Sequence, residues 1–170
     1  MNTDFAALPC PDICADTTLQ VSQITVREAT PNDADSLNTL YRLLTANAAV
    51  NVRPDRIAAI AKHDDHFLLI AEIDNHVCGT VFTSFCMDAM FGEQPFTVIE
   101  NIVIDMSWRR HGVGRKLLAT VEAMSIARTS SKMMLLSAIE REFAHAFFQK
   151  IGFASDKKRG FVKYRSQFDA

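Results

Sequence analysis

The amino-acid sequence predicts an α/β (α+β) fold in which about four helices flank a central, mixed and mostly antiparallel twisted sheet of six to seven strands. Short apolar runs with the alternation typical of strands recur along the chain, and longer segments between them repeat their apolar residues at helical spacing. The strand-like runs 67–73 and 77–86 are joined by Asp74, Asn75 and His76, which favour a turn and therefore an antiparallel hairpin.

The individual elements follow in order from residue 24, after an irregular extension over residues 1–23 that lacks periodicity. Thr30 and Pro31 mark the start of the first helix, because threonine is a favoured N-cap and proline fits the first helical position. The expected strands are 24–28, 67–73, 77–86, 96–105, 133–136, a return strand from Phe153, and 160–168. The expected helices are 31–44, 53–63, 113–124 and a last helix that Gly152 ends, and residues 24–170 make up the predicted domain.

Composition limits the classes of function. The chain has 170 residues, enough for one domain with a sizeable core, and its net charge of −2 disfavours partners such as nucleic acid or an anionic membrane. No apolar run approaches the length of a membrane span, and the first residues do not resemble a secretory signal, so we expect a cytoplasmic protein. No metal site is expected, because the four cysteines do not form two close pairs.

The segment from Phe96 to Leu118 carries the strongest functional signal. An apolar, β-rich run over 96–105 is followed by glycines at 112 and 114, which open an amphipathic helix. Because glycine has no Cβ and a helix N-terminus attracts anions, this arrangement predicts a phosphate-binding turn. The residues after Gly114 do not fit the pattern of nucleoside triphosphatases, and two glycines do not make a dinucleotide-binding fingerprint.

Two polar residues, Glu100 and Asn101, interrupt the apolar strand. A carboxylate inside a strand covered on both faces either finds a partner or has its ionisation suppressed by burial, and the second case suits proton transfer. Glu100 is therefore a candidate general base, with a structural carboxylate as the alternative, and Asn101 is either a substrate contact or a structural residue. We interpret the sequence HDDH at 63–66 as a polar link rather than a metal or catalytic cluster.

The spacing R-x-x-G-x-G, formed by Arg109, Gly112 and Gly114 after a strand, resembles the acetyl-coenzyme A motif of the GNAT superfamily of N-acetyltransferases. The sequences IENIVID at 99–105 and REFAHAFFQKIGF at 141–153 are similar to the fourth strand and the last helix of that superfamily, and the resemblance covers roughly residues 24 to 167. It implies transfer of an acetyl group from acetyl-coenzyme A to a primary amine. A small-molecule acceptor is expected, a protein or peptide acceptor stays open, and a homodimer is expected by analogy.

The resemblance also implies roles for single residues. Main-chain N–H groups from Arg110 to Arg115 would hold the pyrophosphate, and the Ile102 N–H group would polarise the thioester carbonyl while Glu100 collects the amine proton. The residues implied in cofactor binding are Ile102, Val103, Ile104, Arg109, Arg110, His111, Gly112, Val113, Gly114, Arg115, Arg141 and Phe148.

Phe148 departs from the family pattern, in which most relatives carry a tyrosine whose hydroxyl protonates the departing thiolate. Packing on Phe153 is a sufficient structural role for it. Water or Tyr164 on the return strand would then supply the proton as a catalytic group. Otherwise the chain binds acetyl-coenzyme A and turns over poorly, so a sensor or partner module is the second hypothesis. His145 is interpreted as an ordinary helix residue.

Overall fold

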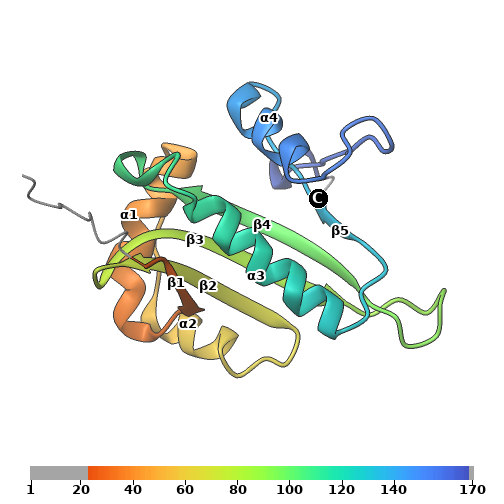
Figure 1. The fold of residues 1–170 in the computed structure, drawn as a ribbon, viewed down its shortest axis with the longest axis horizontal. Coiled ribbons are helices and arrows are strands. Elements are labelled where there is room, and N and C mark those ends of the chain that lie inside the picture. Colours follow the sequence, from red (N-terminus) through yellow and green to blue (C-terminus); the bar gives the residue numbers. More distant parts are fainter. Residues whose placement is uncertain (1–22, 169–170) are drawn as a thin grey trace, which may run out of the picture.

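The computed structural model describes residues 23–168, which form a five-stranded sheet with helices on both faces (Figure 1). The sheet order is β1-β2-β3-β4-β5, with the first four strands antiparallel and β5 parallel to β4. The strands are β1 (Thr25–Glu28), β2 (His66–Ile73), β3 (His76–Cys86), β4 (Phe96–Ile104) and β5 (Met133–Leu135). The helices are α1 (Ala34–Thr45), α2 (Pro54–Ile60), α3 (Val113–Ala127) and α4 (Glu142–Lys150). Apart from residue 23, the extension predicted over 1–23 lies outside the described residues.

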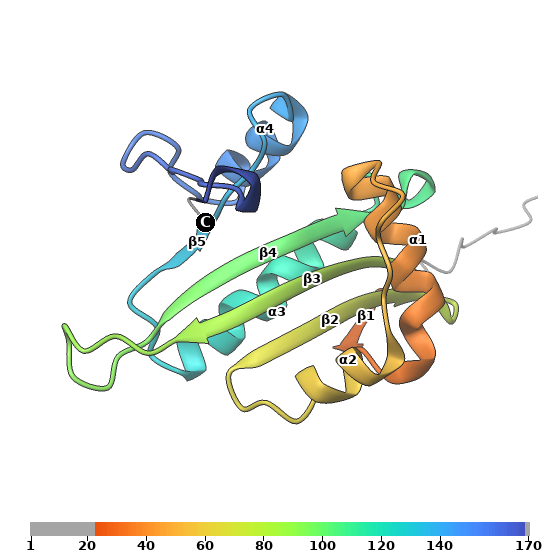
Figure 2. The ribbon, with the colours of Figure 1, turned by 180° about the vertical axis from the view of Figure 1, so that it is seen from behind.

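The core is divided between the two faces of the sheet. Helix α3 crosses one face, and α1 and α2 cover the other, as the two opposite views show (Figures 1 and 2). Strand β2 supplies both sides, because Leu69 and Ala71 pack in the cluster under α3 whereas Leu68 and Ile70 pack in the cluster under α1 and α2. A strand buried on both faces reads as a continuous apolar run, which is why β2 lacks strict alternation.

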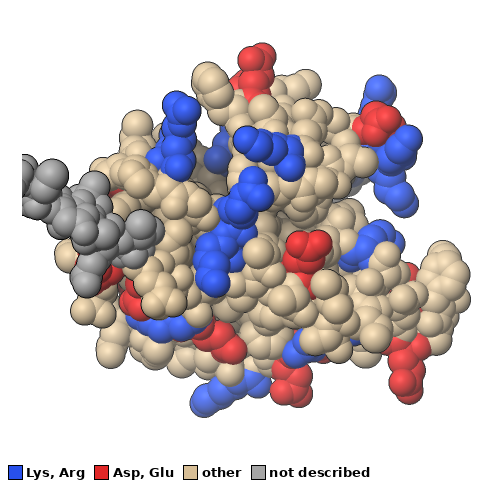
Figure 3. Space-filling view, in the orientation of Figure 1, with Lys and Arg blue, Asp and Glu red and all other residues tan. Residues whose placement is uncertain are grey.

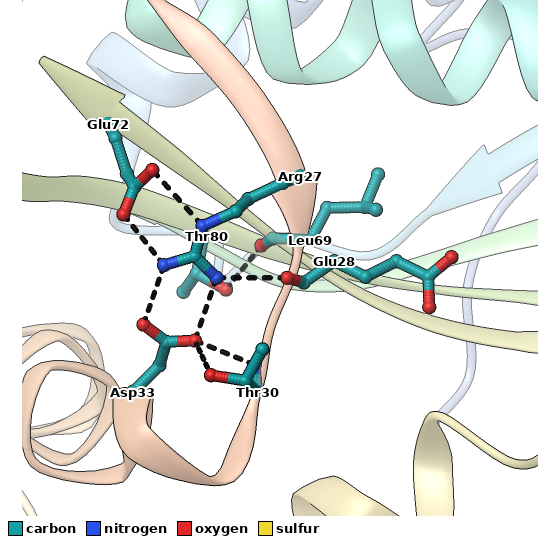
Figure 4. Close-up of polar contacts among 7 residues, drawn as sticks. All are labelled: Arg27, Glu28, Thr30, Asp33, Leu69, Glu72 and Thr80. Carbon is teal, nitrogen blue, oxygen red and sulfur yellow. Dashed lines mark hydrogen bonds and ion pairs between the residues drawn. The ribbon is translucent and has the colours of Figure 1, made fainter. Parts of the chain in front are cut away.

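An ion-pair network ties the start of α1 to the sheet (Figure 4). Arg27 on β1 donates to Asp33 (Nη1 to Oδ2, 2.9 Å) and to Glu72 on β2 (Nη2 to Oε1, 2.7 Å). Asp33 also accepts from the Thr30 N–H group at 2.6 Å, and this bond stabilises the helical start that the sequence predicts at Thr30 and Pro31. There a 3₁₀ turn, Pro31–Asp33, precedes α1. The hydrogen bonds from Arg27 lower the pKa of the buried Asp33 carboxyl to about 2 and raise the pKa of Arg27.

The predicted C-terminal strands are wrong. From Phe153 onward the described chain contains no strand and ends in a single 3₁₀ turn, Arg165–Gln167. Strand β5 is too short to template another strand, because only its three residues pair with β4, opposite Thr97–Ile99. The chain then packs beyond β5, where a Cβ on Gly160 would stand 2.6 Å from Leu136. The α/β class and the mostly antiparallel sheet are confirmed, with five strands in residues 23–168.

Candidate active site

A β-bulge interrupts β4 at the two polar residues. Phe82 pairs with Glu100 and Thr80 pairs with Val103, so that Asn101 and Ile102 together oppose one residue of β3. Asn101 adopts a φ of 53°, in the left-handed region that asparagine tolerates better than most residues. The bulge therefore changes which way successive side chains point, and Glu100 and Asn101 are both exposed.

The exposure of Glu100 corrects one step of the sequence argument. The sequence predicts a buried carboxylate at this position, but Glu100, which pairs with Phe82 directly before the bulge, is exposed. A proton-accepting role for Glu100 would therefore depend on its place beside the bulge.

The turn between β4 and α3 is shaped by internal hydrogen bonds and two positive φ angles. Asp105 accepts from the Ser107 N–H group at 2.9 Å, and the His111 ring Nδ1 lies 2.9 Å from the Arg109 carbonyl oxygen. Arg110 has a φ of 68° and Gly112 a φ of 89°. Left-handed residues in such a turn bring successive N–H groups to one concave side, which suits an anion.

The start of α3 adds unpaired donors to this turn. The first intrahelical bond runs from the Lys116 N–H group to the Gly112 carbonyl at 2.9 Å, so the N–H groups of residues 113–115 precede it and have no helical acceptor. Gly114 also allows close packing of α4, because a Cβ there would lie 3.2 Å from the Phe147 ring. Lys and Arg side chains gather over this part of α3, beside a hollow surface (Figure 3).

A pocket of about 480 Å³ opens on the other face of the sheet, between α1, α2 and the segment that joins them. Tyr41, Ile57, Leu68 and Phe82 provide apolar walls, and Asn101 brings the β4 bulge into the lining. Burial raises the pKa of the Tyr41 phenol to about 12, so this wall is uncharged at neutral pH. The bulge thus places the pocket beside β4, the strand that leads into the turn before α3.

The sequence did not single out the two arginines at this pocket, Arg53 and Arg56. Their spacing of three residues on a predicted helix was the available signal, because residues at i and i+3 share a helix face. Nothing local indicated that this face would border a cavity.

Several residues that the resemblance assigned to the site lie outside the bulge and the turn. Phe148 is only 7% exposed and packs against Phe147 and Phe153, which is the structural alternative expected for it. Tyr164 is 68% exposed and precedes the last 3₁₀ turn instead of lying on a strand. Arg141 is the exposed N-cap of α4.

The helix residue His145 and the histidine cluster serve local structure. His145 Nε2 lies 2.9 Å from the Ala138 carbonyl oxygen and so ties α4 to the segment before it. In the cluster, the His63 and His66 rings approach to 4.0 Å, and Asp65 accepts from Arg128 at 3.0 Å. The polar link expected at 63–66 therefore joins a turn to the end of α3.

Neither a metal centre nor a membrane span is found in the part of the chain that the structure describes. Within residues 23–168, no three His, Cys, Asp or Glu side chains are grouped so as to hold a metal ion. In the same range, every helix is too short or too polar to cross a bilayer. The described cysteines, Cys78 and Cys86, are free thiols, and burial raises the pKa of Cys78 to about 11.

Comparison with known proteins finds one matching family and several solved structures with a similar fold. The model of the acetyltransferase (GNAT) family matches residues 36–153. Glucosamine-6-phosphate N-acetyltransferase from Arabidopsis thaliana superposes with a TM-score of 0.72 at 19% identity, over 84% of this chain and 99% of that one. An acetyltransferase from Trypanosoma brucei gives 0.70 at 21% identity, over 84% and 100%. The aminoglycoside N-acetyltransferase AAC(6')-Iy, in complex with a bisubstrate analog, gives 0.71 at 20% identity, over 85% and 99%. A search of curated proteins finds no match.

Proposed function

The chain belongs to the acetyltransferase (GNAT) family and is an acyltransferase, and we propose that it transfers the acetyl group of acetyl-coenzyme A to a primary amine of a small molecule. The observation that carries this proposal is the succession of bulge, positive-φ turn and helix start over 100–115. The main-chain N–H groups at the start of α3 would be donors for a diphosphate, and the backbone of β4 would run alongside the acyl-bearing arm of the carrier.

The acyl carrier fits the residues present. Main-chain N–H groups at the start of α3 and the nearby cationic side chains suit a diphosphate. Because β5 pairs with β4 only at Thr97–Ile99, no strand of the described chain lies beside residues 100–104 on that side, which leaves room for an extended pantetheine arm. The Ser137 hydroxyl, two residues beyond β5, is buried without a hydrogen-bonding partner among residues 23–168, as expected of a group that a ligand would satisfy.

The proposed reaction is direct attack within a ternary complex. The nitrogen lone pair of the amine attacks the carbonyl carbon of the thioester, the carbon–sulfur bond breaks, and the sulfur leaves with the electron pair as thiolate. The Ile102 N–H group is proposed to polarise the carbonyl oxygen. Glu100 is proposed to take one proton from the amine, directly or through water, and water is proposed to return a proton to the thiolate, since Tyr164 lies outside the bulge and the turn.

A small acceptor is supported by the pocket. A cavity of about 480 Å³ with apolar walls lies in the size range of small-molecule sites, and its lining includes a residue of the bulge. A protein or peptide acceptor would have to enter the same cavity. The second candidate function, an acetyl-coenzyme A sensor, is favoured by one observation, the buried Phe148 in place of a phenol.

We also propose that the chain forms a homodimer through its C-terminal part. Ile139, Phe143 and Phe161 expose 82%, 97% and 88% of their surface. The run 160–168 has a strand pattern but pairs with no strand in the described chain. Exposed large apolar side chains are typical of surfaces covered by a partner, and a second copy would bury them.

The function is tested first at Gly112. We expect Gly112→Asp to weaken coenzyme A binding by about 100-fold or more, because a carboxylate would face the diphosphate. Isothermal titration calorimetry measures the affinity. Gly92→Asp is the matched control, since Gly92 has a φ of 68° in an exposed loop with no neighbour within 4 Å. Equal affinities for the two variants would refute the assignment of the turn.

The role of Glu100 has its own test. We expect Glu100→Gln to lower kcat by about 10- to 100-fold and to leave coenzyme A affinity unchanged. Thiol release at saturating donor, followed across pH, measures this. An unchanged pH profile and kcat would make Glu100 a structural residue of the bulge.

A further inference from the structure

The charged side chains that line the pocket beside the bulge are all basic. Arg53 and Arg56 are the charged residues in its lining, and no Asp or Glu lines it among the described residues. All other lining side chains are uncharged, including the Tyr41 phenol. A ligand with several positive charges would therefore enter a cavity whose lining contains arginines and no acidic side chain among the described residues, which is unfavourable.

A second hollow of about 290 Å³ adjoins the first through the same two arginines and is also lined by Asp55 and Ala59. Asp55 is held by Arg53 in a two-pronged ion pair, with Nε to Oδ1 at 3.0 Å and Nη2 to Oδ2 at 2.6 Å. The Arg56 side chain has no hydrogen-bond or ion-pair partner among residues 23–168. Two cations and one neutralising carboxylate leave a net positive charge at the junction of the hollows.

The lining of the pocket combines three kinds of group. It includes Asn101 of the β4 bulge, the two arginines of the α2 segment, and apolar residues such as Ile57, Leu68 and Phe82. An unpaired guanidinium binds carboxylate or phosphate groups through two parallel hydrogen bonds. An acceptor that fits would present an amine to the bulge, an apolar body to the walls and an anion to Arg56.

Building on the proposed acetyl transfer, we propose that the acceptor is an amine that also carries an oxyanion, either a carboxylate or a phosphate-type group, on an apolar body. Arg56 binds the oxyanion beside the ion pair that Arg53 forms with Asp55. Polycationic amines such as aminoglycosides are excluded from this class by the charge of the lining.

The test compares probes that differ only at the end remote from the amine. They are 4-(2-aminoethyl)benzoate, its phosphonate analogue and the uncharged 2-(4-methylphenyl)ethylamine, with kanamycin as the polycation. We expect kcat/KM for thiol release to be about 10- to 100-fold higher for the anionic probes than for the uncharged one. The carboxylate and phosphonate arms show which oxyanion is preferred. An equal or higher kcat/KM for the uncharged probe or kanamycin would overturn the inference and leave acetyl transfer intact.

Variants test whether the preference for anionic probes depends on the Arg56 side chain. Arg56→Met should remove the preference for the anionic probe with little change for the uncharged one, and Arg56→Lys should restore part of it. Arg42→Met, at an exposed arginine of α1 outside the pocket lining, is the matched control and should behave like the unaltered chain. A preference that survives in Arg56→Met would overturn the inference.

A binding measurement separates the two proposals. Calorimetry with 4-(2-aminoethyl)benzoate in the presence of coenzyme A reports the acceptor site without any reaction. If this probe binds, Arg56→Met weakens it about tenfold or more, and no probe releases thiol, then the oxyanion site stands and the proposed acetyl transfer fails. If coenzyme A binds and neither anionic probe does, the oxyanion site is refuted.

Discussion

The body of the molecule, residues 23–127, and its C-terminal part, residues 133–168, differ in how far their large apolar side chains are buried. In the body, Leu37, Ile70 and Leu117 are fully buried between the sheet and its helices. In the C-terminal part, Ile139, Phe143 and Phe161 are largely exposed. Both parts are rich in apolar residues, so composition does not cause the difference.

The difference in burial follows from how much sheet surface each part of the chain has to pack against. Helices α1, α2 and α3 lie on a sheet of four long or well-paired strands, which offers them two broad faces. The C-terminal part has one short strand, β5, and packs on α3 through residues such as Phe147, and Phe148 is its one buried large side chain among those described. Its remaining apolar surface is available to the acyl carrier or to a second copy, which is the basis of the homodimer proposal.

The largest expected effect compares truncations in the two parts. Leu117→Ala should lower the free energy of unfolding by about 3 kcal/mol, because it leaves a cavity under the sheet. Phe143→Ala, at a side chain that is 97% exposed, should change it by less than about 0.5 kcal/mol. Urea denaturation of both variants measures this. Similar losses for the two would show that Phe143 is covered in the folded chain.

A smaller effect is expected from acid on the ion pairs of the body. The pKa of Asp33 is about 2 in the folded chain, below its ordinary value of 3.8, so its stabilising contribution is complete above pH 4 and is lost as pH falls toward 2. We expect a loss of about 2 kcal/mol at most, reduced by screening because Arg27 is 39% exposed.

Asp33→Asn should remove this acid-dependent component while keeping an oxygen for the Thr30 N–H group. The free energy of unfolding, measured by urea titration between pH 2 and 5, should then fall less steeply in the variant. Asp35→Asn, at an exposed residue of the same helix, is the control and should retain the full slope. Parallel curves for Asp33→Asn and the unaltered chain would show that the network contributes nothing to acid stability.

The smallest effect on stability, with a separate effect on assembly, is expected at Phe161. Phe161→Ser should leave the free energy of unfolding of the chain nearly unchanged, since the side chain is 88% exposed. It should shift the mass in light scattering from twice 19.0 kDa toward 19.0 kDa. A monomeric unaltered chain at micromolar concentration would refute the dimer.

Much of the body could be predicted from local patterns. The helix start at Thr30 and Pro31, the hairpin of β2 and β3, and the passage from β4 through Gly112 into α3 each depend on residues close in sequence. The C-terminal strands were wrong because a strand needs a partner edge, and the run 160–168 carries no information about whether β5 offers one.

By itself, the sequence determined the place and the order of the glycine-bearing turn between β4 and α3, because glycine at a positive φ and the unpaired donors of a helix start are local properties. Only the tertiary structure decided that Glu100 faces solvent, that Phe148 is buried, and that Arg53 and Arg56 border a cavity which also contains Asn101. These outcomes depend on the register of β3 against β4 and on the packing of α2 over the sheet. Such contacts join residues ten or more positions apart, and no local pattern specifies them.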